Sequence, residues 1–166
     1  MDKKESKEKE SKEKKGKKEM KISHEGLSLI KKFEGCKLEA YQDAVGIWTI
    51  AYGRIKEVKE GHTCTQEQAE EWLDEELHEY QSYVEDMVEV SLLQNQFDAL
   101  VSWVYNLGPS NLKSSTLLKV LNSGEYKSVP EQIKRWNKAG GNVLEGLTRR
   151  REAEAFLFEG KEWKQV

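Results

Sequence analysis

The sequence predicts an α+β fold that is mostly helical, with one small β element near the N-terminus. The first observation is a stretch at 46–53 that is rich in β-branched and aromatic residues and is bounded by glycines, as strands often are. The second is that apolar residues recur at helical spacing in one segment before this stretch and in several after it. Between the β-bearing part and the helical part we expect a cleft.

The first helix is expected to follow Ser23, a candidate N-cap, and to end at Glu34, because Gly35 suits the position after a helix. Its apolar stripe consists of Leu27, Ile30 and Phe33. The strand at 46–53 comes next. Tyr41 and Gln42 are its candidate partner across a turn at 43–46.

Capping signals divide the rest of the chain into helices. Capping boxes pair Thr65 with Gln68, Ser91 with Gln94 and Ser128 with Glu131. The helix after the second box has the widest apolar stripe, so we expect it to be central and well buried, and to stop at 108–109. Further helices are expected at 116–121, from 128 to about 139, and from about 147 to 160.

Charge is distributed unevenly along the chain. The formal net charge is −3, but residues 1–21 hold ten Lys against six Asp and Glu, so this segment carries +4 and the rest carries −7. With almost no apolar residue to bury, 1–21 is expected to be a disordered, solubilising tail, and an electrostatic arm is the alternative. Residues 22–166 are expected to form one domain. Its acidic charge argues against nucleic acid as a partner.

The remaining composition excludes several classes of protein. Cys36 and Cys64 are too few for a disulfide scaffold, and two free thiols or a single bridge remain open. His24, His62 and His78 are scattered among polar residues and complete no zinc set, so no metal and no cofactor is expected. No apolar run reaches the roughly 18 residues of a membrane span, and the charged N-terminus is unlike a secretory signal.

Two carboxylates and a hydroxyl stand at the joints of the predicted helix–turn–strand unit. Glu34 closes an apolar stripe at the negative end of a helix, where both surroundings favour a protonated carboxyl, as a general acid needs. Asp43 leads a turn in which backbone hydrogen bonds keep it ionised, and Thr49 lies on the strand with a hydroxyl that could hold water. Hydrolysis of a glycosidic bond uses such a carboxyl pair. Ordinary structural roles are the alternative, because each residue type is common at its position.

The order of several blocks resembles the phage-type lysozymes, the endolysins of glycoside hydrolase family 24. The blocks are Phe33-Glu34-Gly35, Ala40 to Asp43, and Trp48 to Gly53, followed by the stretches 94–108, 115–122 and 135–154. The Glu, Asp and Thr of that family are spaced nine and then six positions apart, as Glu34, Asp43 and Thr49 are. The resemblance covers about residues 22–160.

The resemblance implies a lysozyme-like fold and hydrolysis of the β-1,4 bond between N-acetylmuramic acid and N-acetylglucosamine in peptidoglycan. It implies that Glu34 is the general acid and that Asp43 and Thr49 position water or stabilise the transition state. An inverting course would place the two carboxyls roughly 6.5–9.5 Å apart. Residues expected to line or support the saccharide groove are Tyr52, Asn106, Arg149 and Arg150. The alternatives for the two arginines are a helix surface or an ion pair with Glu34.

Two residues depart from the family pattern. Where the family usually has Gly-Tyr-Gly-His, this chain has Ala51, Tyr52, Gly53 and Arg54. We expect these departures to affect local strand geometry and the response to pH more than activity. The resemblance also implies a monomer that is made in the host bacterial cytoplasm. It would act on the cell wall after a holin opens the membrane.

Two other functions are compatible with the same fold. A non-catalytic module that binds peptidoglycan would not need Glu34, Asp43 and Thr49 together. A lytic transglycosylase needs the Glu but not the Asp and Thr, since it cleaves the bond without water. The intact trio therefore favours hydrolysis.

Overall fold

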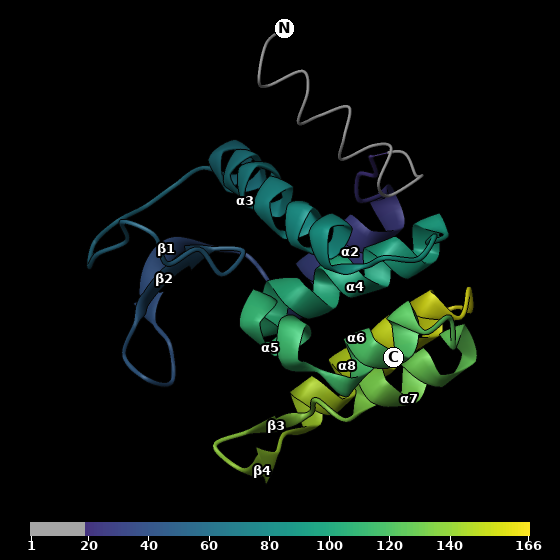
Figure 1. Ribbon diagram of the computed structural model, residues 1–166. Helices are drawn as coiled ribbons and strands as arrows, with labels where there is room; N and C mark the ends of the chain where they lie inside the picture. The colour runs from purple at the N-terminus through teal and green to yellow at the C-terminus, as the bar shows by residue number, and fades with distance from the viewer. Residues whose placement is uncertain (1–18) are drawn as a thin grey trace, which may run out of the picture.

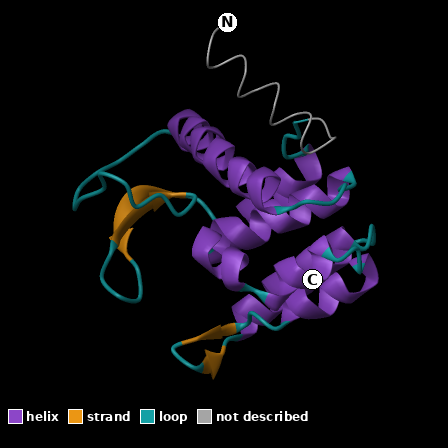
Figure 2. Ribbon diagram, viewed as in Figure 1, coloured by secondary structure: helices purple, strands orange, loops and turns teal. Residues whose placement is uncertain are grey.

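The computed structural model describes residues 19–166, which form a helical body with a two-stranded hairpin projecting to one side (Figure 1). In chain order the elements are α2 (His24–Glu34), β1 (Lys37–Gln42), β2 (Trp48–Ala51), α3 (Gln66–Met87), α4 (Gln94–Leu107), α5 (Pro109–Ser114), α6 (Thr116–Asn122), the 3-10 helix η1 (Tyr126–Ser128), α7 (Val129–Lys134), β3 (Lys138–Ala139), β4 (Asn142–Val143) and α8 (Glu145–Phe158). Figure 2 shows how little strand accompanies the helices. The predicted α+β class is confirmed.

The folded part begins slightly earlier than the sequence predicts. The charged tail predicted for 1–21 lies, as far as residue 18, outside the described residues. Met20 already donates its backbone N–H to Glu85, and the carbonyl of Lys21 accepts from the Gln94 side chain at 2.7 Å. The last two residues of the predicted tail are therefore fastened to α3 and α4.

The hairpin has the predicted partners and a shorter second strand. Tyr41 pairs with Thr49 and Gln42 pairs with Trp48 in antiparallel register. The second strand spans only 48–51, because the glycines at both ends of the predicted stretch have positive φ and turn the chain away. On its other side β1 is bridged to the segment before α3 through Glu39 and Thr63.

α4 is the centre of the helical body, as the wide apolar stripe predicts. Every residue from Phe97 to Val104 is buried, and α2, α3 and α8 all pack against this helix. Trp103 is fully buried and meets the Trp136 ring edge to face, with the ring centroids 5.2 Å apart. This arrangement anchors α2, and with it the helix end that carries Glu34, to the most buried element of the fold.

Helix boundaries follow the capping signals only in part. The Thr65 hydroxyl accepts from the Gln68 N–H at 3.1 Å, as predicted. The box at Ser91 is wrong, because Leu93 occupies the N-cap position and its N–H donates to Gln96 instead. The box at Ser128 is wrong as well, since that side chain makes no cap hydrogen bond.

The sequence patterns do not predict two short features of the fold, α5 and the hairpin of β3 and β4. α5 begins at Pro109, directly after α4, because proline is well suited to the first turn of a helix. The helix that begins at Val129 ends at Lys134 instead of continuing to about 139, and the hairpin of β3 and β4 takes its place. Among the helices of the described residues, none has both the length and the apolar character that crossing a membrane requires.

Candidate active site

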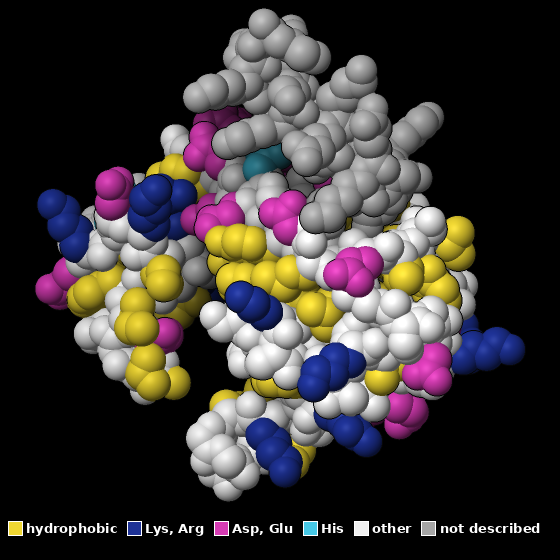
Figure 3. Space-filling model, viewed as in Figure 1, with side chains coloured by type: hydrophobic (Ala, Val, Ile, Leu, Met, Phe, Trp, Pro, Cys, Tyr) yellow, Lys and Arg dark blue, Asp and Glu magenta, His cyan; other side chains and the backbone are white. Residues whose placement is uncertain are grey.

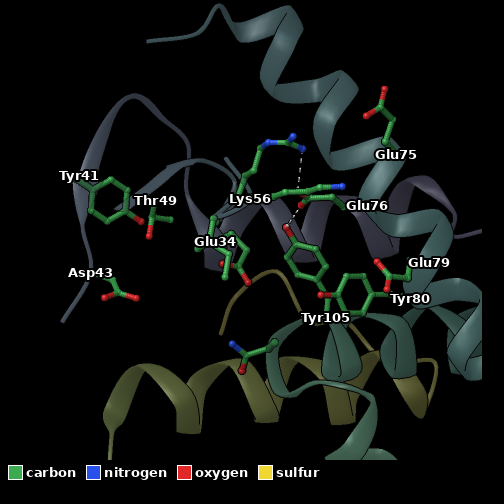
Figure 4. Close-up of a pocket in the computed structure, with 14 residues that line it drawn as sticks. Glu34, Tyr41, Asp43, Thr49, Lys56, Glu75, Glu76, Glu79, Tyr80 and Tyr105 are labelled. Atoms are coloured by element: carbon green, nitrogen blue, oxygen red, sulfur yellow. Dashed lines mark hydrogen bonds and ion pairs between the residues drawn. The ribbon is translucent and has the colours of Figure 1, made fainter. Parts of the chain in front are cut away.

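A cleft of about 680 Å³ separates the hairpin from the helical body. Figure 3 shows the surface notched between the part that carries β1 and β2 and the rest of the molecule. The residues that line the cleft are Glu34, Tyr41, Asp43, Thr49, Gly53, Arg54, Ile55, Lys56, Glu75, Glu76, Glu79, Tyr80, Tyr105 and Asn106. They come from the end of α2, the hairpin, the segment that follows β2, α3 and α4, and the close-up in Figure 4 shows how these parts meet.

Glu34 is the last residue of α2, and it lines the cleft. Gly35, with φ +67°, ends the helix and starts the chain toward β1. Gly53 lies directly beside the carboxyl, because a Cβ on this glycine would stand 2.9 Å from Glu34 Oε1. A side chain at position 53 would crowd the Glu34 carboxyl, and the φ of +89° at this position favours glycine as well.

Arg150 binds the Glu34 carboxylate from beneath the cleft. Its Nη1 donates to Glu34 Oε2 at 2.7 Å, and its Nε donates to Glu154 Oε2 at 3.2 Å. The arginine is buried, whereas the Glu34 side chain keeps 18% of its surface exposed. Burial by itself lowers the pKa of the Arg150 guanidinium, but the two carboxylates raise it above its ordinary value. The ion pair fixes the direction of the Glu34 carboxyl at the floor of the cleft.

Asp43 is held by the tip of the hairpin. Its Oδ1 accepts the backbone N–H of Val45 at 3.0 Å and that of Ile47 at 2.9 Å. These two bonds fix the direction of the carboxyl group, as expected for an aspartate that leads a turn. The other carboxylate oxygen, Oδ2, takes no part in these two bonds and can accept a hydrogen bond from water.

Thr49 lies across the hairpin from Tyr41 and lines the cleft although the residue is almost buried. Its hydroxyl donates to the carbonyl of Ile47 at 2.9 Å, which fixes the rotamer. The lone pairs of the hydroxyl oxygen can then accept a hydrogen bond from water. The structure therefore brings all three predicted catalytic residues into the same cleft (Figure 4).

The predicted groove residues have four different positions. Asn106 lines the cleft, and its Oδ1 accepts from Arg151 Nη2 at 2.6 Å. Tyr52 is not among the lining residues, because its hydroxyl donates to Glu70 on α3 at 3.0 Å, so its contribution is to support the end of β2. Arg149 is exposed on α8 and is also outside the lining set, as its helix-surface alternative implies. Arg150 takes the ion-pair alternative with Glu34.

Both departures from the family pattern have a structural consequence. Ala51 has φ +57°, a conformation that favours glycine, and its methyl group is buried. The strain of about 1–2 kcal/mol is partly offset by about 0.8 kcal/mol from burying the methyl group. Arg54 lines the cleft and donates from Nη1 to Glu76 Oε1 at 3.1 Å.

The sequence patterns miss several residues that shape the site. Glu76 and Tyr105 lie on the faces of α3 and α4 that meet at the cleft. Glu154 lies beneath Arg150 and also pairs with Arg151, with Arg151 Nε 2.9 Å from Glu154 Oε1. The sequence signals for this cluster are the spacings on one helix, four between Arg150 and Glu154 and three between Arg151 and Glu154.

The described residues hold no group of three or more His, Cys, Asp or Glu side chains arranged to bind a metal. Cys36 and Cys64 are free thiols, both partly buried. Burial raises the pKa of each thiol above its ordinary value, which disfavours the reactive thiolate.

Comparison with known proteins places this geometry in a family. The family model described as phage lysozyme matches residues 31–154. An endolysin of Acyrthosiphon pisum secondary endosymbiont phage 1 is 43% identical over 144 residues, which cover 84% of this chain and 99% of the relative. The endolysin of Salmonella phage P22 is 38% identical over the same shares of the two chains.

Solved structures agree with the sequence relatives. The endolysin from Escherichia coli O157:H7 phage FAHEc1 superposes with a TM-score of 0.79 at 38% identity, covering 90% of this chain and 97% of that one. The muramidase domain of SpmX from Asticaccaulis excentricus superposes with a TM-score of 0.78 at 37% identity, covering 83% and 97%. The lysozyme-like fold is confirmed, and the chain belongs to the phage lysozyme family.

Proposed function

We propose that the chain cleaves the β-1,4 bond between N-acetylmuramic acid and N-acetylglucosamine, with Glu34 as the general acid. Membership of the phage lysozyme family makes the chain a lysozyme, an endolysin that hydrolyses peptidoglycan in host cell lysis. Glu34 would protonate the glycosidic oxygen as the bond breaks. Asp43 and Thr49 would hold the water that attacks the sugar from the opposite side.

The observation that carries this proposal is the convergence of Glu34, Asp43 and Thr49 on one cleft from three different joints of the chain. Asp43 is fixed as an acceptor by two backbone donors, and Thr49 is fixed by its bond to the Ile47 carbonyl. Two fixed acceptors on the hairpin side of the cleft are suited to orient one water molecule toward a sugar that contacts Glu34.

Arg150 would act as a positioning residue for the acid. Its buried guanidinium fixes the direction of the Glu34 carboxyl, which a flexible glutamate would otherwise lose. When a saccharide fills the cleft, water leaves the exposed part of this carboxyl. Removal of water disfavours the charged form and so prepares the carboxyl to give a proton.

The lysozyme is proposed to act as a monomer on the bacterial cell wall, after synthesis in the host cytoplasm. A holin that opens the membrane would let it reach the wall. The asymmetric cleft within one chain supports the monomer, since Glu34, Asp43 and Thr49 all come from the same copy.

Glu34→Gln tests the central assignment. The amide keeps the size of the side chain but has no proton to give, so clearing of a cell-wall suspension should fall by about a thousandfold or more. Glu39→Gln, on an exposed face of β1, is the matched control and should clear at the normal rate. Circular dichroism should show both variants folded. Clearing by Glu34→Gln at the control rate would overturn the assignment.

Product analysis separates hydrolysis from the other functions. A hydrolase releases free reducing sugars from purified peptidoglycan, and we expect this product. A 1,6-anhydro product would indicate a lytic transglycosylase, and binding without any new product would indicate a non-catalytic module. Either of these results would contradict the proposed roles of Asp43 and Thr49.

A further inference from the structure

The chain segment that follows β2 is fastened to two helices of the body. The Tyr105 hydroxyl, on α4, lies 2.8 Å from the Tyr52 carbonyl and 3.4 Å from Glu76 Oε2. Its single proton is directed mainly at the shorter contact. Arg54 Nη1 donates to the other oxygen of Glu76, on α3, at 3.1 Å. Tyr52 is thus bonded to Tyr105 and Arg54 to Glu76, and these two side chains are neighbours on the helical body.

The Arg54 guanidinium is enclosed on two sides. Its central carbon lies 4.6 Å from the centroid of the Trp72 ring, and the carboxylate of Glu76 lies at its edge. The Arg54 side chain keeps only 14% of its surface exposed. A cation between an indole face and a carboxylate, largely shielded from water, interacts more strongly than a surface ion pair.

Gly53 lies between these two fastened residues and next to the proposed acid. A Cβ at this position would stand 2.9 Å from Glu34 Oε1, so the segment after β2 and the Glu34 carboxyl are neighbours. Movement away would widen the gap between Glu34 and the hairpin that carries Asp43 and Thr49. The contacts at 52 and 54 therefore determine how the two sides of the cleft are spaced.

We propose that Arg54, Glu76 and Tyr105 form a positioning latch that holds the end of β2 on α3 and α4 and so sets the spacing of the catalytic groups. The latch deepens the proposed function, since it rests on the role assigned to Glu34. None of the three residues needs to touch the bond that breaks. A displacement of about 1 Å in such a framework can cost on the order of a hundredfold in rate.

Arginine keeps its charge at every pH at which proteins are stable, so this partner in the latch does not titrate. An unperturbed histidine, the residue type usual at this position in the family, loses its charge near pH 6.5. Burial raises the pKa of the Glu76 carboxyl, and the charge of Arg54 and the Tyr105 hydroxyl act in the opposite direction. Exchange of Arg54 for histidine should therefore convert a permanent latch into one that opens as the pH rises.

Other titratable groups surround position 54, and the experiment has to separate their effects. The titratable groups that line the cleft together with Arg54 and Glu76 are Glu34, Tyr41, Asp43, Lys56, Glu75, Glu79, Tyr80 and Tyr105. His62 packs edge to face on Trp72, with the ring centroids 6.2 Å apart. All of these groups are common to every variant at position 54, so a ratio of two such variants cancels their titration.

The test compares Arg54→His with Arg54→Lys on soluble peptidoglycan fragments from about pH 5.5 to about pH 8.5. The ratio of their kcat values should fall about tenfold across this range as the histidine loses its charge, while KM changes by less than about twofold. The ratio of Arg54→Lys to the unchanged protein should stay flat. Glu76→Gln, which removes the carboxylate at every pH, should lose kcat by a constant factor.

A flat ratio for Arg54→His would overturn the latch. A fall in kcat that follows a loss of folded protein, measured by circular dichroism at each pH, would also overturn it, because the role would then be structural only. Failure of the proposed function is recognised separately. If Glu34→Gln clears cell walls at the normal rate, Glu34 is not the acid, whatever the pH dependence at position 54.

Discussion

Glu154 is fully buried on α8 and forms ion pairs with two arginines. Its carboxylate contacts Arg150 and Arg151, and it also accepts from the Ser102 hydroxyl at 2.6 Å. Burial lowers the pKa of the Arg151 guanidinium, and the charge of Glu154 opposes this effect. Beneath the cleft, Glu34 and Glu154 together balance the two buried guanidinium charges.

Glu154→Gln should lower the free energy of unfolding by about 3–5 kcal/mol, because it leaves Arg151 buried without its carboxylate. Urea denaturation followed by tryptophan fluorescence measures the change. The matched control is Glu131→Gln, since Glu131 is exposed and pairs with Lys134 on the surface, where loss of the pair should have no measurable effect. Equal stabilities for the two variants would show that the buried cluster does not hold the fold together.

The contact between α2 and α4 depends on one small residue and one buried carboxylate. Asp98, on α4, accepts from the backbone N–H of Ser23 at 2.9 Å and from its hydroxyl, so α4 caps the start of α2 from outside. Gly26 packs against this aspartate, because a Cβ there would stand 2.7 Å from Asp98 Cβ. Ser23 is thus the N-cap residue by position, but its side chain bonds α4 and not its own helix.

Gly26→Ala should lower the free energy of unfolding by about 1–3 kcal/mol, since the added methyl group forces the two helices apart. Gly146→Ala is the matched control, because this glycine is also helical and a Cβ there meets no atom within 4 Å. Alanine should raise stability at 146 by about 0.5–1 kcal/mol. Thermal unfolding of both variants checks the difference in sign, and a gain at 26 would contradict the close packing of α2 on α4.

Across the whole molecule, the N-terminal segment from residue 19 is part of the folded body. Ile22 donates its backbone N–H to the side chain of Gln81 at 2.7 Å, and Gln81 is buried on α3. Met20 packs against the core as well. Contacts with α3 and α4 therefore begin at Met20, just before the change in composition at 21–22.

A chain shortened by residues 1–18 should keep its melting temperature and its activity on purified peptidoglycan, because the Lys, Glu and Ser of that stretch offer almost nothing to bury. A chain shortened by residues 1–22 should lose about 1–3 kcal/mol, since it leaves the Gln81 amide buried without its backbone donor. Differential scanning calorimetry compares the two. A large loss of activity in the first chain would favour an arm that engages the substrate or its surroundings.

The sequence by itself determined the class of the fold, the order of most elements and the positions of Glu34, Asp43 and Thr49. Local signals suffice for the class and the order, because periodicity and glycines are properties of neighbouring positions, whereas the resemblance to the phage-type lysozymes pointed to Glu34, Asp43 and Thr49. Only the tertiary structure decided which side chains face the cleft. It turned Tyr52 toward α3, left Arg149 in solvent and placed Arg150 under Glu34. The contacts of Glu76, Tyr105 and Glu154 at the site could be recognised only in the tertiary structure. Side chains distant in sequence meet only when α3, α4 and α8 pack together.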